Sequence, residues 1–99
     1  MSDLARQELK KILAISYHPR LSGVNMDGLD LRNLNFANAD LTRTILSNTN
    51  LSGTYLRNSR MEEANLENAN LTGANLIGAI LFGANVDGAK IDINAGYQR

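Results

Sequence analysis

Large apolar residues recur at every fifth position of the chain from residue 26 to residue 91. All fourteen positions of this column hold Leu, Met, Phe, Val or Ile. A column of apolar or small residues lies two positions earlier, and a column rich in Asn and Asp lies between the two. A period of five fits neither an α-helix nor a long strand, but it fits a short extended segment followed by a turn. Because alternate side chains of an extended segment face opposite ways, the large and small columns are predicted to point inward and the Asn/Asp column outward.

The last position of each five-residue unit predicts how the chain turns. It is Gly or Asn in eleven of the fourteen units, and the exceptions are Arg43, Glu63 and Ile93. Gly and Asn tolerate the positive φ that the third residue of a type II turn requires. We therefore expect a type II turn beginning at each large apolar residue, and another turn type at the three exceptions.

The number of units in one coil does not follow from the period alone. The small column changes in blocks of four, from mostly large residues to hydroxyl residues and then to alanine, which favours four units per coil. Coils of twenty residues would stack about 4.8 Å apart. The interior ladders would then be Leu21–Leu41–Met61–Leu81, Met26–Leu46–Leu66–Val86, Leu31–Leu51–Leu71–Ile91 and Phe36–Leu56–Leu76.

A short amphipathic helix is expected before the first coil. The apolar residues at helical spacing are Ala5, Leu9, Ile12, Leu13 and Tyr17. Pro19 disfavours helical geometry at His18, so the helix should end there. The apolar stripe is expected to cover the first coil, because the open end of a repeat array needs a cap. A helix that binds a partner is the alternative.

The run ANLENANLTGANLIGAILFGANVDGA resembles the pentapeptide-repeat family, whose motif is A-(N/D)-L-x-x, and the chain is similar to a small bacterial member. The resemblance covers residues 24–93. It implies an all-β solenoid, namely a right-handed four-sided β-helix with the Leu/Phe and Ala columns inside. Leu29 and Leu34 depart from the motif, since alanine is usual there, and they suggest a wider or differently covered first coil.

These patterns divide the chain into three parts. Residues 1–18 form the N-terminal capping α-helix, residues 19–93 the pentapeptide-repeat β-helix, and residues 94–99 a C-terminal tail. The tail is too short for a second helix and offers only Tyr97 as cover, so we expect the C-terminal end of the solenoid to be open.

Composition excludes most chemistry. There is no cysteine and only one histidine, His18, so neither a metal site nor a catalytic set is expected. The glycines fall at turn positions rather than in a phosphate-binding loop. Ten basic and ten acidic residues balance, which argues against nucleic acid or a membrane as the partner. We expect a cytoplasmic protein that is not an enzyme and needs no cofactor.

Two surface features are candidates for contact with a partner. The first is an acidic stripe formed by Asp27, Glu67 and Asp87, for which a solvated face is the favoured interpretation. The second is apolar and lies near the C-terminal end. Its residues are Ile77, Ile80, Phe82, Ile91 and Ile93. Exposed apolar clusters tend to mark contacts, although packing of Phe82 over its own turn would explain it equally well.

The leading functional hypothesis is a non-catalytic structural or protein-interaction solenoid. Its partner is expected to be a protein, either a second copy or a separate pentapeptide-repeat chain that pairs with the open C-terminal end. The family resemblance implies an alternative, a DNA-mimicking binder of a type II topoisomerase (gyrase). That role needs a long and strongly negative rod. Residues 19–93 carry six positive and eight negative charges, or −2, and their stack would be only about 17 Å tall.

Overall fold

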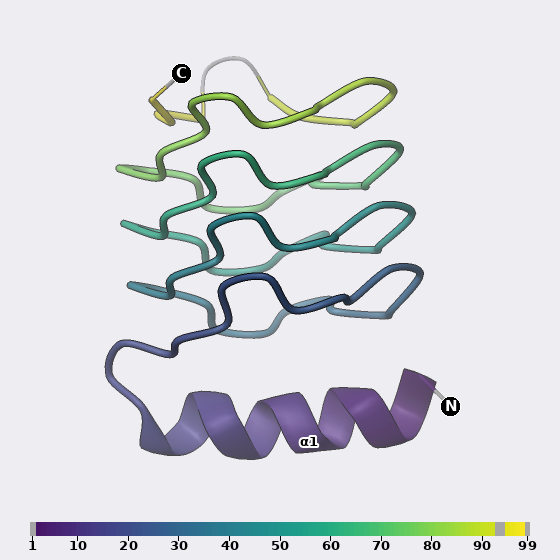
Figure 1. The fold of residues 1–99 in the computed structure, drawn as a ribbon, viewed down its shortest axis with the longest axis vertical. Helices are drawn as coiled ribbons and strands as arrows, with labels where there is room; N and C mark the ends of the chain where they lie inside the picture. Colours follow the sequence, from purple (N-terminus) through teal and green to yellow (C-terminus); the bar gives the residue numbers. More distant parts are fainter. Residues whose placement is uncertain (1, 93–94, 99) are drawn as a thin grey trace.

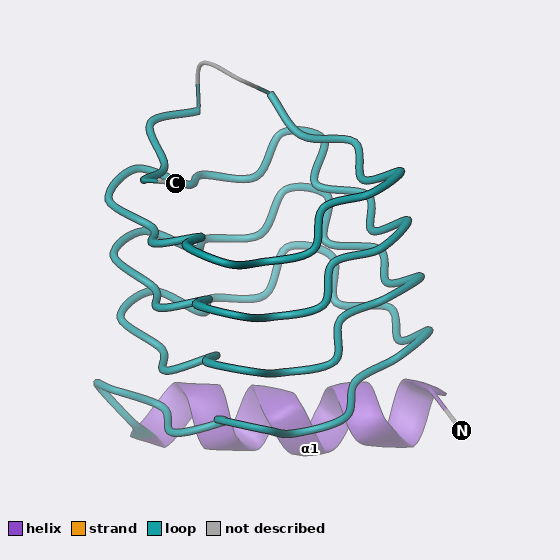
Figure 2. Cartoon of the chain, turned by 45° about the horizontal axis from the view of Figure 1, so that its top comes forward, coloured by secondary structure: helices purple, strands orange, loops and turns teal. Residues whose placement is uncertain are grey.

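The computed structural model describes residues 2–92 and 95–98. Helix α1 (Ser2–Ile15) lies across one end of a stack of flat coils, and the C-terminus lies at the other end (Figure 1). Within the described residues the coils are joined by isolated parallel bridges rather than by longer strands, so Figure 2 draws the whole stack as loops and turns. The extended part of each unit is therefore very short.

The bridges fix the register of the stack. Each one from Arg20–Asp40 to Asn70–Lys90 joins two residues that are twenty apart, so four five-residue units make one coil, as the blocks in the small column indicated. Backbone bonds run in both directions between coils. The amide of Leu31 donates to the carbonyl of the Asn50 peptide at 2.9 Å in the next coil. Each unit is thus held mainly by the units directly above and below it.

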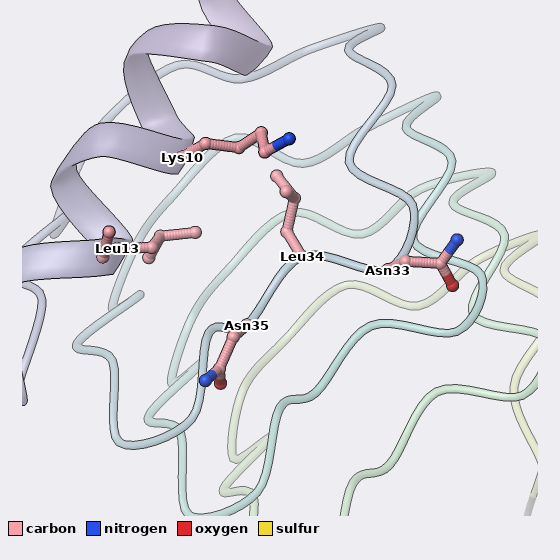
Figure 3. A pocket seen from close by; sticks show the side chains of 6 residues that line it. Lys10, Leu13, Asn33, Leu34 and Asn35 are labelled. Atoms are coloured by element: carbon pink, nitrogen blue, oxygen red, sulfur yellow. The ribbon is translucent and has the colours of Figure 1, made fainter.

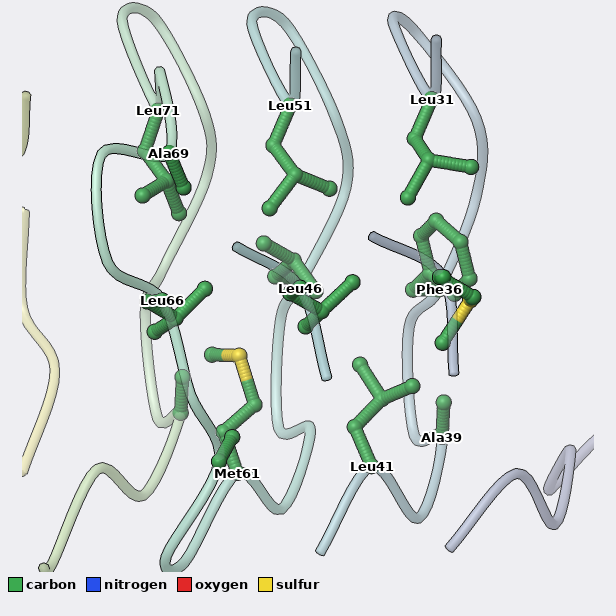
Figure 4. Close-up of a cluster of buried hydrophobic side chains, with 14 of the residues drawn as sticks. Leu31, Phe36, Ala39, Leu41, Leu46, Leu51, Met61, Leu66, Ala69 and Leu71 are labelled. Carbon is green, nitrogen blue, oxygen red and sulfur yellow. The ribbon is translucent and has the colours of Figure 1, made fainter. Parts of the chain in front are cut away.

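The large column fills the interior of the stack. Phe36, Leu56 and Leu66 are completely buried. Leu31, Leu51 and Leu71 follow one another from coil to coil as one of the expected ladders (Figure 4). The predicted inward direction of this column is therefore seen directly, and the core is continuous along the axis.

The small column is also buried over most of its length, although Val24 at its start is 38% exposed and the expected inward direction is wrong there. The hydroxyl groups of Thr44, Thr49 and Thr54 are buried and donate to the carbonyl three residues earlier, at 2.6 to 2.8 Å. These bonds let a polar side chain stand in the core without losing its hydrogen bond. The buried hydroxyl of Ser59 makes no such bond to a described residue.

The turns follow one pattern along the stack, including two of the three positions for which we expected another. In a representative turn the amide of Leu34 donates to the carbonyl of Leu31, and Asn33 between them has a φ of 60°. Arg43 and Glu63 have φ values of 58° and 61°, so the expectation of a different turn at these residues is wrong. The third exception, Ile93, lies outside the described residues. The strain at Arg43 and Glu63 is tolerated because the bonds to neighbouring coils fix the backbone.

The outward Asn/Asp column closes the turns from outside. The Oδ1 atom of Asn65 accepts a hydrogen bond from the amide of Glu67 at 3.0 Å, and Asn85 does the same with Asp87. The same bond recurs in the other units with Asn or Asp at this position, which are Asn25, Asp30, Asn35, Asp40, Asn50, Asn70 and Asn75. Asn and Asp are frequent here because their short side chains reach the amide two residues ahead.

Helix α1 takes the place of a missing coil. The guanidinium of Arg6 donates to the carbonyls of Asp30 and Arg32 at 3.0 and 2.7 Å. In the next coil the corresponding carbonyls, those of Asn50 and Ser52, accept bonds from the coil beneath. Arg6 therefore satisfies two acceptors that would otherwise face an absent layer, which matters because unpaired edge groups invite pairing with other chains.

The apolar stripe of α1 is narrower than expected. Leu9 is buried and Leu13 packs against the core cluster. Ile12, which the helical spacing placed in the same stripe, is 41% exposed. Tyr17 is 78% exposed and lies beyond the helix, because α1 ends at Ile15 rather than at His18 as expected. Tyr17 instead stacks edge-on against His18, with ring centroids 4.6 Å apart.

The C-terminal end is less open than the sequence led us to expect. The described tail, 95–98, adds part of another layer. Ile80 bridges Gln98, and the amide of Gln98 donates to the carbonyl of Ala79 at 2.7 Å. Tyr97 packs against the core. The step from Ile80 to Gln98 is eighteen residues rather than twenty, so the tail takes a shortened path and covers one side of the last coil rather than all of it.

Candidate interaction surfaces

Ile77, Ile80 and Phe82, which we call the apolar corner, lie on one side of the last coil and its two flanking turns. Ile77 and Phe82 are 49% and 54% exposed, whereas Ile80 is half-buried. One coil below, beneath Ile80 and Phe82, stand Arg60 and Glu62, which form an ion pair at 3.2 Å. The apolar corner therefore replaces a charged pair at the end of the stack.

Ile91 and Ile93 were grouped with these residues as partner-binding candidates. Ile91 continues the interior ladder that contains Leu71, and it is half-buried against the core rather than on the outer surface. Ile93 lies outside the described residues.

The last coil also presents backbone groups that are paired in every coil beneath it. The amides of Gly83, Val86 and Gly88 and the carbonyls of Ala84 and Ala89 make no backbone hydrogen bond to a described residue. Such an edge is a template for another strand. Among the described residues, the tail covers the neighbouring side of this coil, so the edge that has no described backbone partner is confined to residues 83–91.

The acidic stripe follows the register of the coils. Asp27, Ser47, Glu67 and Asp87 fall one above another at twenty-residue steps. The Ser47 hydroxyl donates to Asp27 Oδ1 at 2.7 Å, and the side-chain Nδ2 of Asn48 donates to the same oxygen at 3.0 Å. These bonds lower the pKa of Asp27. In the part of the chain that the structure describes, no three His, Cys, Asp or Glu side chains gather as metal ligands.

Asp30 is the most strongly perturbed carboxyl among the described residues. Two bonds from the Arg32 guanidinium, at 2.9 and 2.8 Å, are the main cause that lowers the pKa of Asp30 to about 2, and the charge of Arg6 adds to the effect. The ionised carboxylate thereby links α1 to the first coil.

This shift predicts a dependence of stability on pH. Because the folded pKa of Asp30 lies below its usual value of about 4, its contribution is complete above pH 4 and is lost as the pH falls toward 2. We expect the free energy of unfolding, measured with urea, to fall over this range, and to fall less in an Asp30→Asn variant. Equal slopes for the two proteins would contradict the prediction.

A cleft of about 360 Å³ opens between α1 and the first coil. It is lined by Lys10, Leu13, Ala14, Asn33, Leu34 and Asn35. Lys10 and Leu13 project from the helix toward Leu34 (Figure 3). Leu34 is buried and Leu29 packs against the core, so these two departures from the repeat motif lie in a first coil covered by a helix rather than by another coil. The sequence signal for the cleft was the replacement of alanine by leucine, although its position beside α1 was not predicted.

The described residues include no helix that is both long and apolar enough to cross a membrane. The cleft contains one charged side chain, that of Lys10, among apolar and amide groups. The described part of the chain is therefore a regular solenoid, with α1 covering one end and the tail covering part of the other.

These features define a β-solenoid of five-residue units with a helical cap. The family model described as "Pentapeptide repeats (8 copies)" matches residues 20–58 and 59–92. The chain belongs to the pentapeptide-repeat family, whose fold is a right-handed β-helix.

Solved structures of the same family are similar to the chain. The pentapeptide repeat protein Rfr23 from the cyanobacterium Cyanothece 51142 has 39% sequence identity and a TM-score of 0.57, over 80% of this chain and 55% of Rfr23. HetL from the cyanobacterium Nostoc sp. strain PCC 7120, a protein involved in heterocyst differentiation regulation, has 34% identity and a TM-score of 0.58, over 72% of this chain and 35% of HetL. The chain thus spans about half the length of Rfr23 and a third of HetL. No curated protein matches it.

Proposed function

We propose that the chain is a non-catalytic, cytoplasmic interaction solenoid that binds a protein through its C-terminal end. The uncovered backbone edge of residues 83–91 carries this proposal, because it offers both hydrogen-bonding groups and the end of an apolar core. The apolar corner lies directly beside this edge and enlarges the contact area. The partner that fits such an edge is another solenoid end, either a second copy or a separate pentapeptide-repeat chain.

HetL, to which the chain is similar, is involved in heterocyst differentiation regulation, and a regulatory role is compatible with a non-catalytic solenoid. The DNA-mimicking alternative, a gyrase binder, has no observation in its favour. The chain measures 31 × 25 × 23 Å with its helix included, and its formal net charge is zero. A mimic of duplex DNA needs a longer and more negative surface to replace the phosphate backbone.

Sedimentation at several concentrations tests the proposal for the second copy. We expect the wild-type chain to associate as its concentration rises. Phe82→Glu should weaken this association about tenfold, because it places a charge beside the edge that the second copy would cover. Tyr55→Glu is the matched control. Tyr55 is 55% exposed, close to the 54% of Phe82, but it lies in the middle of the stack.

Tyr55→Glu should therefore associate like the wild type. For a separate chain as partner, the same variants are compared after capture from the native host with mass spectrometry of bound proteins. A wild type that stays monomeric and captures no pentapeptide-repeat chain would refute the proposal. If Phe82→Glu and Tyr55→Glu had equal effects on association, the apolar corner would not be part of the binding surface.

A further inference from the structure

The sequence contains two Asp-Gly pairs, Asp27-Gly28 and Asp87-Gly88, and no Asn-Gly pair. An aspartyl residue isomerises most readily when glycine follows it, because glycine has no side chain to hinder the attack of its amide nitrogen on the neighbouring carboxyl group. The two pairs hold the same place in the repeat, three coils apart. They therefore allow a comparison within one chain of how the fold controls this reaction.

The reaction passes through a succinimide ring. The glycine nitrogen attacks Cγ of the aspartate, a new bond forms between nitrogen and carbon, and the carboxyl hydroxyl leaves with the amide proton as water. A water molecule then opens the ring at either carbonyl. Opening at one carbonyl restores aspartate, and opening at the other leaves the main chain running through the side-chain carbon, which is isoaspartate. Atoms balance over the two steps, and water is the only co-reactant.

The local structure of the two pairs is the same. The amides of Asp27 and Asp87 each donate to the Oδ1 atom of the asparagine two residues earlier, at 3.0 Å. The glycines that follow have φ values of 75° and 72°. Both aspartates and both glycines are exposed to solvent. Neither the turn nor the exposure therefore distinguishes the two pairs.

The carboxyl groups of the two pairs differ in their contacts. Asp27 Oδ1 accepts the hydrogen bonds from the Ser47 hydroxyl and from Asn48 Nδ2, at 2.7 and 3.0 Å. The side chain of Asp87 makes no hydrogen bond or ion pair to a described residue. The two bonds restrain the carboxyl group of Asp27, and by lowering its pKa they disfavour the protonated form from which the hydroxyl leaves.

The attacking nitrogens differ in the same direction. The amide of Gly28 donates to the carbonyl of Ser47 at 2.9 Å, whereas the amide of Gly88 makes no backbone hydrogen bond to a described residue. The attack requires loss of the amide proton, and an amide without a partner gives up its proton to water more readily.

One hydrogen bond opposes ring closure at the second pair. The carbonyl of Asp87 accepts from the amide of Asn68 at 2.9 Å, and rotation of the peptide toward the side chain breaks this bond. The same rotation at the first pair breaks the bond from Gly28 to Ser47, so the backbone cost is similar at both pairs. The bonds to the carboxyl group of Asp27 therefore decide which pair reacts.

We propose that Asp87-Gly88 is a site of spontaneous isoaspartate formation in the folded protein, whereas contacts with the next coil protect Asp27-Gly28. Isoaspartate adds one carbon to the main chain inside the turn that is closed by the 3.0 Å bond from the amide of Ala89 to the carbonyl of Val86. The modification lengthens this turn at the edge that we propose for a partner, but its formation does not depend on that partner.

Incubation of the folded protein in heavy-oxygen water tests the proposal. Each ring opening incorporates one oxygen atom from water, so mass spectrometry of the peptides measures the reaction at each pair. A protease that cleaves before aspartate but not before isoaspartate identifies the product. We expect label to accumulate about tenfold faster at Asp87 than at Asp27, since fewer hydrogen bonds must break. The protein is kept dilute, so that no second copy covers the Gly88 amide.

The same incubation in urea is the control for sequence. Both pairs lose their contacts in the unfolded chain, so their rates of labelling should be similar. Equal labelling of the two pairs in the folded protein would overturn the proposal. So would a folded protein without label at Asp87 when the unfolded chain is labelled at both pairs.

The double variant Ser47→Ala, Asn48→Gly tests the cause of protection. It removes both bonds to Asp27 Oδ1 and keeps the backbone bond from Gly28, and glycine suits the φ of 59° at position 48. Labelling at Asp27 should rise toward the rate at Asp87, while labelling at Asp87 stays the same. An unchanged rate at Asp27 in this folded variant would refute protection by the side-chain bonds.

Discussion

Replacing Leu66 by lysine is expected to unfold the protein or lower its stability by several kcal/mol. Leu66 is 0% exposed in the middle of the stack, with a coil on either side. An ammonium group there would be buried without a partner, and the cost of an unpaired buried charge is about 3–5 kcal/mol. A domain of this size has about 5–15 kcal/mol of total stability, so the loss is a large share of it.

Asn65→Lys is the control, one residue away on the outer face. It loses the hydrogen bond that the backbone amide of Glu67 donates to Asn65 Oδ1, which is worth about 1 kcal/mol. Urea unfolding followed by circular dichroism should therefore separate the two variants clearly. If both were equally stable, the assignment of inward and outward columns would be wrong.

The register of twenty residues per coil was predictable because the size of the residues in the small column changes from one coil to the next. Three blocks of the small column, from mostly large residues to Thr and Ser and then to Ala, each occupy one coil, and a layer of core selects one size class. The uniform turn was not predictable at Arg43 and Glu63, because residue preference alone disfavours positive φ there. Bonds to two neighbouring coils outweigh that preference, and they are visible only once the register is known.

The ends of the stack were less predictable than its middle, because they depend on contacts outside the repeat. From the sequence, Arg6 is an ordinary polar residue of an amphipathic helix. Its role in pairing the carbonyls of Asp30 and Arg32 is visible only in the structure. The exposure of Ile77 and Phe82 did follow from the period. The partial cover of the C-terminal end did not, since the bridge from Ile80 to Gln98 breaks the twenty-residue spacing.

The two phenylalanines should respond very differently to truncation. Phe36 is 0% exposed and Phe82 is 54% exposed. Phe36→Ala should cost about 3–5 kcal/mol, from lost burial plus the cavity left behind. The cavity cannot close, because bonds of 2.7 Å from the amide of Phe36 to the carbonyl of Tyr55, and their equivalents in other units, hold the coils at a fixed spacing. Phe82→Ala should change stability by less than about 0.5 kcal/mol.

Phe36→Leu provides an intermediate test of the same ladder. Leucine is the residue found directly above, at Leu56 and Leu76, so its shape fits the interior. We expect a loss of about 1 kcal/mol, the usual cost of a modest change in core volume. Thermal unfolding at a protein concentration below that of any self-association should rank the variants Phe82→Ala, Phe36→Leu and Phe36→Ala in order of decreasing stability. If Phe36→Ala were as stable as Phe36→Leu, the coils would be able to collapse onto the space left by the ring, and their spacing would not be fixed by the backbone bonds.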